Sequence, residues 1–356
     1  MSFPKVAIIV LNWNGWEDTV ECLESLTQID HPNYQIIVVD NASTNDSIKK
    51  IEDWAEGKII VNSKYFKFDP LTKPIPYVEY SRKSAEDGGD PERGKDACKL
   101  LANGMTHPLI IIKNENNLGF AKGNNVGIRY SISNPVNEYI LILNNDTVVK
   151  KDFLNNLVEG FKIDPRVALA GPKIYDYYSG VHWQGYVPRR INFLTNIMLF
   201  TPLYRIFIKT PFIRNYLVRD NKPKIAYGIP GCAMMFKREL FKKIGYFDEA
   251  TFLGWEEYIV AEKLMREKLL TYVMPRSVIY HKVARDTMKT EPSEKTIIFL
   301  KSEKYFQDRY LKMPSWQVLI VRSVRASIYS ALALVNVSYR KNYAQIMHAL
   351  FEKRMK

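Results

Sequence analysis

Two apolar runs that each end in a carboxylate constrain this chain more than any other feature. Residues 139–142 lead into Asn144, Asn145 and Asp146, and residues 36–39 lead directly into Asp40. A short apolar run that stops at polar residues is typical of a buried parallel strand, and ligands of open α/β sheets lie beyond the carboxyl ends of such strands. The oxygens of these side chains suit a hard divalent cation. We therefore expect one site for a charged ligand, such as a nucleotide with its metal.

The surrounding pattern predicts an α/β fold with a mixed, mainly parallel sheet flanked by helices, because apolar runs alternate with helical periodicity. Glycines at 119, 123 and 127 follow a further apolar run, and we expect their backbone to approach a ligand closely. Strands are expected at 6–11, 36–39, 109–112 and 167–175, and helices at 16–26 and 153–161. Two further helices are expected to end at about residue 55 and at about residue 133.

The chain of 356 residues is expected to contain one large domain and a smaller helical region. The domain covers residues 1–290, with an insertion at about 58–108 where the periodicity weakens and Pro, Lys, Gly and charged residues dominate. Within the insertion, order is expected around residues 77–80. Residues 291–356 form the helical C-terminal region.

The net charge of +13 implies either an anionic partner or a solvated basic surface. Nucleic acid, anionic lipid and phosphorylated substrates would all be attracted. No nucleic-acid recognition motif is present and the strand ends are acidic, so we expect no nucleic-acid partner.

Two stretches place apolar residues at helical intervals with basic residues between them. The stretch 191–217 contains no apolar run near the roughly 20 residues that span a bilayer, and Arg322 and Arg325 interrupt the stripe in 315–356. Both suit helices that lie in the interface of an anionic membrane. For 191–217, a helix pair packed on the core is an equal alternative.

The cysteines indicate the compartment. Cys22, Cys98 and Cys232 are widely spaced, which argues against a disulfide framework and a zinc site and fits a reducing environment. The start of the chain lacks the basic and apolar segments of a signal peptide. We therefore expect a cytoplasmic protein that is peripheral at the inner face of the cell membrane.

Five motifs occur in an order that resembles the family 2 glycosyltransferases of the GT-A fold, and especially their rhamnosyltransferase-like branch. The resemblance covers roughly residues 5–56 and 109–285. It implies a nucleotide-diphosphate-sugar donor and a lipid-linked or polysaccharide acceptor. The motifs are residues 6–15, 39–46, 117–128, 143–147 and 231–249, the last followed by 255–257.

The same resemblance assigns roles to individual residues. Asp146 matches the last acid of the family's metal motif, with His281 as a further ligand of the metal or diphosphate, and the expected cofactor is Mg²⁺ or Mn²⁺. Asn144 stands where many relatives carry the first acid of that motif. The donor-binding residues implied are Asn12, Asn14, Asp40, Asn117, Gly119, Lys122, Asn125, Asn144 and Asn145.

The chemistry of transfer agrees with these roles. A divalent metal neutralises the charge that develops on the leaving diphosphate. A carboxylate must accept the proton of the acceptor hydroxyl, and the resemblance gives this role to Glu257, with Glu256 beside it. Relatives carry Asp at position 257, so the carboxylate here is displaced by about one methylene. A single displacement inverts the anomeric centre.

Several alternatives stay open at this point. The donor is either dTDP-rhamnose-like or a UDP-hexose, and Asn144 and Glu257 permit a catalytically degenerate nucleotide-sugar-binding scaffold. Asp40 and Asp146 could cap helices, Glu257 could start a solvated helix, and His281 could be a core histidine. Trp183 and Trp255 could stack on sugar rings or belong to the core.

Overall fold

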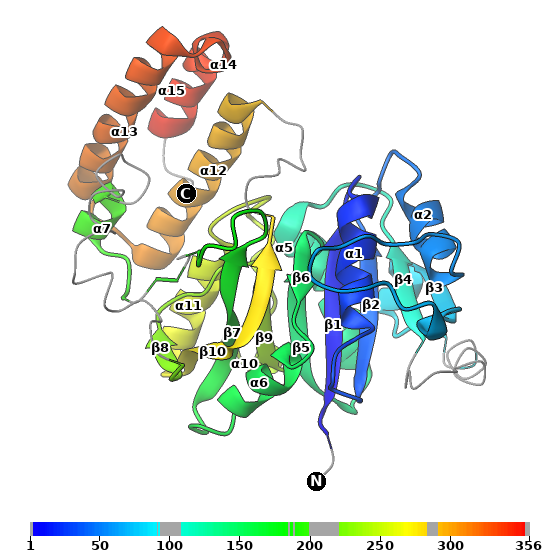
Figure 1. The fold of residues 1–356 in the computed structure, drawn as a ribbon. Helices are drawn as coiled ribbons and strands as arrows, with labels where there is room; N and C mark the ends of the chain where they lie inside the picture. The colour runs from blue at the N-terminus through cyan, green and yellow to red at the C-terminus, as the bar shows by residue number, and fades with distance from the viewer. Residues whose placement is uncertain are drawn as a thin grey trace.

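In this computed structural model the described residues are 3–90, 92, 108–183, 186–187, 189–198, 221–282 and 291–352. Ten strands in these segments form one sheet (Figure 1). They are β1 (Lys5–Asn12), β2 (Tyr34–Asp40), β3 (Tyr77–Ser81), β4 (Leu109–Lys113), β5 (Asn137–Asn144), β6 (Thr147–Val149), β7 (Val167–Asp176), β8 (Lys224–Ala226), β9 (Ala233–Lys237) and β10 (Leu270–His281). Their order is β3-β4-β2-β1-β5-β9-β7-β10-β6, with β8 also paired to β10.

The helices cover both faces of this sheet and continue beyond it. They are α1 (Trp16–Leu26), α2 (Ser47–Ala55), α3 (Arg82–Glu86), α5 (Gly119–Ser133), α6 (Phe153–Gly160), α7 (Phe193–Met198), α10 (Leu240–Ile244) and α11 (Glu256–Arg266), then α12 (Pro292–Phe306), α13 (Ser315–Val335), α14 (Val337–Lys341) and α15 (Tyr343–Phe351). Apolar side chains of α1, α2 and α6 enter one buried cluster with the sheet, and those of α3, α5, α10 and α11 enter another.

The five strands from β3 to β5 are parallel, which brings their carboxyl ends to one edge. Ile8 pairs with Ile36 on one side and Leu141 on the other, and all three are buried, as in a parallel sheet covered on both faces. Asn12 ends β1 opposite Asp40. The predicted fold, with its helical C-terminal extension, is confirmed.

An antiparallel half extends the sheet and brings a distant residue to the same edge. β9 runs antiparallel between β5 and β7, and β10 returns parallel to β7. The short β6, which follows Asp146, pairs antiparallel with β10 so that Thr147 lies opposite His281. His281 therefore sits beside Asp146, although 134 residues separate them in the chain.

The predicted insertion is partly built into the sheet. Residues around 77–80 are ordered as expected, and β3 forms the edge strand, parallel to β4. Residues 93–107 lie outside the described part of the chain.

Gly123 and Gly127 of α5 approach the sheet and not a ligand, which corrects the expectation from their spacing. A Cβ at Gly123 would lie 2.8 Å from Leu11, and one at Gly127 would lie 2.7 Å from Ile9. These two glycines let α5 pack closely on β1. Gly119 has φ 75°, and a Cβ there would lie 2.4 Å from the carbonyl oxygen of Phe252.

Gly119→Ala is therefore expected to lower the free energy of unfolding by about 2–5 kcal/mol, because left-handed backbone and a clash with main chain add. Gly180 provides the control, since it has φ 66° but nothing within 4 Å of an added Cβ. Gly180→Ala should lose only the backbone term, about 1–2 kcal/mol. Urea unfolding measures both, and equal losses would contradict the clash.

The C-terminal helices form a bundle that stands above part of the carboxyl edge (Figure 1). It is bound to the start of α11: Trp255 stacks on Phe306 with ring centroids 5.2 Å apart, and Ser302 donates to the carbonyl of Leu253 at 3.0 Å. Within the bundle, buried Arg325 pairs with Glu303 at 2.6 Å. Of the predicted stretch 191–217, α7 is described and residues 199–220 lie outside the described chain.

Among the described residues, α13 is the one helix long and apolar enough to cross a membrane. It has 21 residues and a mean hydropathy of 1.7, and 22% of that stretch is buried. The criterion is the length and the amino-acid composition of the helix.

Candidate functional site

A hydrogen-bond network joins the ends of β1 and β2. Asp40 accepts from Asn12 Nδ2 at 2.7 Å and from the hydroxyl and amide of Ser43 at 2.6 and 2.9 Å. Thr19 donates to Asn12 Oδ1 at 2.7 Å. Asn12 is fully buried and Asp40 nearly so. A carboxylate has about four acceptor positions, so one position of Asp40 remains for a ligand.

The two loops that follow these strands have left-handed backbone at non-glycine residues. Asn14 has φ 53° and Ala42 has φ 61°. Asn14 Oδ1 accepts the amide of Thr44 at 2.7 Å, which fastens one loop to the other. Such conformations cost about 1–3 kcal/mol each and concentrate at functional sites.

Asn41 organises the segment in front of α5, and the sequence interpretation missed it. Its Nδ2 donates to Asn117 Oδ1 at 2.8 Å and to the carbonyl of Gly119 at 3.1 Å. The amide of Phe120 donates to the carbonyl of Phe252 at 2.8 Å. This segment therefore connects the end of β2 with the residues that precede α11.

Asn125 of α5 contacts residues 247 and 249, and Lys122 is close enough to affect Glu249. Asn125 is fully buried, accepts the amide of Phe247 at 3.0 Å and donates to Glu249 at 3.0 Å. Burial opposes ionisation of Glu249, but hydrogen bonds from Asn125 and Arg129, with Lys122 nearby, lower its pKa. The expected donor contact by Asn125 has no room here, so Asn125 positions a loop.

Asp146 and His281 face each other at the edge where β6 meets β10. Asp146 Oδ1 and His281 Nε2 are 3.1 Å apart, and both side chains are largely buried. Within the described structure neither atom has a hydrogen-bond partner. Two ligands of an octahedral ion with bonds of about 2.1 Å lie about 3 Å apart. An oxygen and an imidazole nitrogen at this separation fit Mg²⁺ or Mn²⁺.

No group of three or more His, Cys, Asp or Glu side chains that could hold a metal occurs in the described segments. Asp146 and His281 would therefore supply only part of a coordination shell. A diphosphate and water would supply the remaining oxygens, as is usual for Mg²⁺ at phosphate sites.

Glu256 and Glu257 open α11, and Trp255 before them has φ 73°. Glu256 is buried, and Glu257 is partly exposed. Burial, with a contribution from Glu257, raises the pKa of Glu256 to about 8, and burial raises the pKa of Glu257 to about 7. Carboxylates with pKa values near the working pH are suited to proton transfer.

The raised pKa of Glu256 predicts a pH-dependent stability. The folded state holds the proton more tightly than the unfolded chain, so this contribution is fully present below about pH 4.5 and is lost as the pH rises through about 8. Glu256→Gln should therefore be more stable than wild type by about 1–3 kcal/mol near pH 8.5 and similar near pH 4.5. Urea unfolding at both pH values tests this, with exposed Glu159→Gln as the control. Equal changes in the free energy of unfolding for Glu256→Gln and Glu159→Gln at both pH values would contradict the raised pKa of Glu256.

Cys232 is buried and close enough to Asp146 and Glu257 for both to affect its thiol. Burial raises the pKa of its thiol, and the charges of Asp146 and Glu257 raise it further. Its carbonyl accepts the amide of Asn144 at 2.9 Å. The general-base candidate and the metal candidate thus both lie near Cys232.

A cleft of about 310 Å³ lies at this edge. Four of the predicted donor residues line it, namely Asn117, Gly119, Asn144 and Asn145. Lys295, from α12, is the one charged residue among those that line it. The sequence interpretation missed the lining residues Trp13, Asn41, Phe252, Lys295 and Phe299. Trp13 and Asn41 lie within the motifs 6–15 and 39–46, whereas the other three lie outside every predicted motif.

Asn145 lines the cleft. Its side chain is held in place by a hydrogen bond that Nδ2 donates to Thr19 Oγ1 at 2.9 Å. Trp183 has its ring centroid 6.0 Å from that of His281, next to the candidate metal ligands. Trp255, in contrast, is 2% exposed and belongs to the core. This agrees with the second of the two alternatives given for it, a core residue and not a sugar-stacking one.

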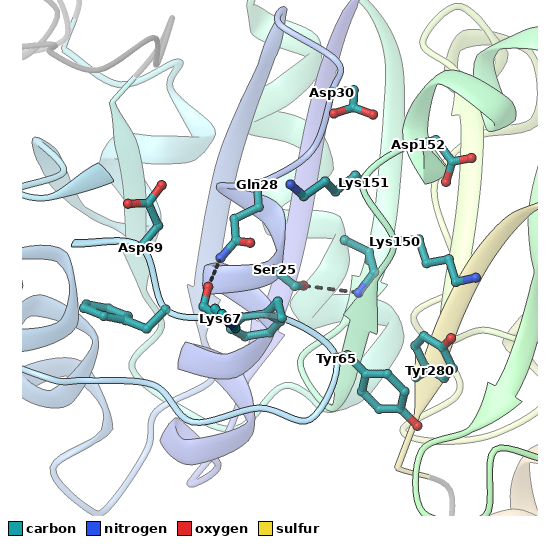
Figure 2. A pocket seen from close by; sticks show the side chains of 13 residues that line it. Ser25, Gln28, Asp30, Tyr65, Lys67, Asp69, Lys150, Lys151, Asp152 and Tyr280 are labelled. Atoms are coloured by element: carbon teal, nitrogen blue, oxygen red, sulfur yellow. Dashed lines mark hydrogen bonds between the residues drawn. The ribbon is translucent and has the colours of Figure 1, made fainter. Parts of the chain in front are cut away.

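A larger hollow, of about 900 Å³, is lined by residues 65–69, by residues 149–152 at the end of β6 and by Ser25 of α1. Figure 2 shows Lys150, Lys151 and Tyr280 on one side of it and Gln28 and Asp69 on the other. None of the predicted site residues lines it. Although this hollow is larger than the cleft, it is not the candidate site, because the predicted residues lie elsewhere.

The fold and this edge define a class of enzyme, the GT-A glycosyltransferases, which take a sugar from a nucleotide donor. Residues 7–68 and 86–245 match the model of glycosyl transferase family 2, and the chain belongs to that family. It is a glycosyltransferase. The comparisons reach the family, while the rhamnosyltransferase-like branch stays a prediction.

The relatives are distant. The low-salt glycan biosynthesis hexosyltransferase Agl10 of Haloferax volcanii is 22% identical over 244 residues, which are 67% of this chain and 68% of the relative. The mannosyltransferase PcManGT from Pyrobaculum calidifontis, solved with GDP-Man and Mn²⁺, has a TM-score of 0.53 and 16% identity over 98% of this chain and 86% of its own. GalNAc-T7, solved with UDP, GalNAc and Mn²⁺, has a TM-score of 0.51 and 14% identity over 86% of this chain. This chain spans about half of that protein, 49%. The two structures support the fold alone.

Proposed function

We propose that the protein transfers a hexosyl or deoxyhexosyl group from a nucleotide-diphosphate sugar to a hydroxyl of a lipid-linked or polysaccharide acceptor. The observation that carries this proposal is the unpartnered pair Asp146 and His281 at the carboxyl edge of the sheet. In a family 2 glycosyltransferase this edge is expected to receive the nucleotide.

Asp146 and His281 would hold a divalent cation, which when bound supplies positive charge to the leaving diphosphate. Asn144 and Asn145 line the cleft beside it. The side-chain amide of Asn144 can donate hydrogens to phosphate oxygens, whereas Asn145 Nδ2 already donates to the carbonyl of Gly15 and to Thr19 Oγ1. Asp40 keeps one acceptor position for the base or ribose of the nucleotide. Asn12 and Asn14 hold Asp40 and its loop in place rather than reaching the ligand with free atoms.

Glu257 would accept the proton of the attacking hydroxyl. It lies in the first turn of α11, and its raised pKa leaves a substantial fraction ionised near neutral pH. Glu256 keeps its proton there and limits the negative charge beside the reacting sugar. Attack on the face opposite the diphosphate inverts the anomeric carbon.

A donor screen tests this function. Binding and hydrolysis of dTDP-rhamnose, UDP-hexoses and GDP-mannose are measured with Mn²⁺, Mg²⁺ or EDTA, in wild type and Asp146→Ala. We expect metal-dependent turnover of one donor that the variant loses. Binding without turnover, in every metal, would instead support a nucleotide-sugar-binding scaffold. No binding of any donor would contradict the donor site.

We also propose that the protein is cytoplasmic and that α13 docks it on an anionic membrane. Trp316, Leu319 and Leu334 are 58%, 57% and 76% exposed. Buried Arg325 pairs with Glu303, so this charge, which seemed to interrupt the apolar stripe, is directed into the bundle. Arg340 and Lys341 are exposed just beyond α13 and suit anionic headgroups.

Flotation with vesicles tests the membrane proposal. Wild type should float with vesicles that contain phosphatidylglycerol and less with pure phosphatidylcholine. Replacing Trp316, Leu319 and Leu334 by Ser should reduce the bound fraction at least about tenfold, since each large side chain contributes about 1.5–3 kcal/mol. Serine at Ile60 and Leu71, which are 69% and 75% exposed elsewhere, is the control. Equal flotation of all variants would contradict the proposal.

A further inference from the structure

Three charged side chains form a buried cluster next to the proposed metal pair. Lys282 Nζ lies 2.5 Å from Asp18 Oδ1 and 2.5 Å from Glu21 Oε2. The three side chains are 5–8% exposed. Asp18 and Glu21 are three residues apart on α1, so they share one face of that helix. None of these three residues takes part in the proposed transfer of the sugar.

The cluster connects directly to the backbone of both proposed metal ligands. Lys282 follows His281, and its amide donates to the carbonyl of Asp146 at 3.0 Å. On the other side, the amide of Tyr177 donates to the carbonyl of His281 at 2.9 Å. The hydroxyl of Tyr177 donates to Glu21 at 2.8 Å, which closes the connection back to α1.

Burying three charges is costly, and hydrophobic residues of similar volume often stabilise a fold equally well. A cluster of this kind therefore suggests a requirement for geometry rather than for stability. The geometry in question is the relative position of two strand ends. His281 is the last residue of β10, and Asp146 directly precedes β6, which pairs with β10. A shift of either strand end would change the 3.1 Å separation of the pair.

We propose that Asp18, Glu21 and Lys282 act as positioning residues that hold Asp146 and His281 at a separation suited to a divalent cation. This inference rests on the proposed metal site. The cluster fixes the end of β10 to α1, while the backbone hydrogen bond from Lys282 fixes it to Asp146. Loss of the cluster would leave both metal ligands present but imprecisely placed.

The test measures binding of Mn²⁺ alone to the full chain, by electron paramagnetic resonance of the free ion. Lys282→Met by itself would leave two buried carboxylates without their cation and could fail to fold. The informative variant is therefore Asp18→Asn/Glu21→Gln/Lys282→Met, which removes all three charges together. We expect it to fold, shown by circular dichroism, and to bind Mn²⁺ about 10- to 100-fold more weakly, the usual effect of losing an outer-shell partner.

A second buried ion pair on α1 provides the matched control. Glu24 and Lys73 are 2.8 Å apart and 0% and 5% exposed, one helical turn beyond Glu21. Glu24→Gln/Lys73→Met should leave the affinity for Mn²⁺ unchanged. Wild-type affinity in the triple variant, or equal weakening in the control, would overturn the positioning role. Wild type without saturable Mn²⁺ binding would overturn the proposed metal site, and the positioning role with it.

Discussion

Asp146→Ala is expected to lower metal-dependent turnover of the nucleotide sugar by about 10³-fold or more. The side chain supplies one of two protein ligands at the candidate site, and a metal that neutralises the leaving group contributes several kcal/mol to the transition state. The variant should lose Mn²⁺ binding as well as turnover. Measuring both separates loss of metal from a defect in the chemical step.

The fold should survive this substitution, because Asp146 Oδ1 has no hydrogen-bond partner in the described structure and its backbone keeps the bond from Lys282. Asp152→Ala is a suitable control, since that exposed carboxylate lies beyond β6 and lines the other hollow. Turnover within a few-fold of wild type in Asp146→Ala, with Mn²⁺ affinity retained, would exclude Asp146 as a metal ligand.

The strand ends of the site could be predicted because their signal is local. Asp40 and Asn144 each follow apolar residues, and the parallel direction that brings them together follows from the helices between the strands. The same reasoning could not place His281 beside Asp146. That contact depends on the antiparallel pairing of β6 with β10, and a three-residue strand has little signal of its own.

The glycines of α5 show a second limit of the sequence. Spacing four residues apart indicates that something approaches the helix closely, but it does not say what. In the structure the neighbour of Gly127 is Ile9 of the sheet. The Asp18, Glu21 and Lys282 cluster was equally hidden, since each charge alone resembles an exposed residue and only tertiary packing pairs them.

Glu257→Gln is expected to lower kcat by about 10²- to 10⁴-fold, the usual range for a general base, while KM for the donor changes little. The amide keeps the size of the side chain but cannot accept the proton of the acceptor hydroxyl. Glu256→Gln is the matched control, because Glu256 already holds its proton near neutral pH. Its kcat should fall much less.

The pH profile provides the sharper test of the same role. Because burial raises the pKa of Glu257 to about 7, the ionised base becomes more abundant as the pH rises through that value, so wild-type kcat/KM should rise there and then level. The residual activity of Glu257→Gln should lack this rise, while Glu257→Asp, with the shorter carboxylate of the relatives, should keep it at a lower rate. A wild-type rise that persists unchanged in Glu257→Gln would assign the base to another residue. A full loss in Glu256→Gln, with Glu257→Gln active, would assign it to Glu256.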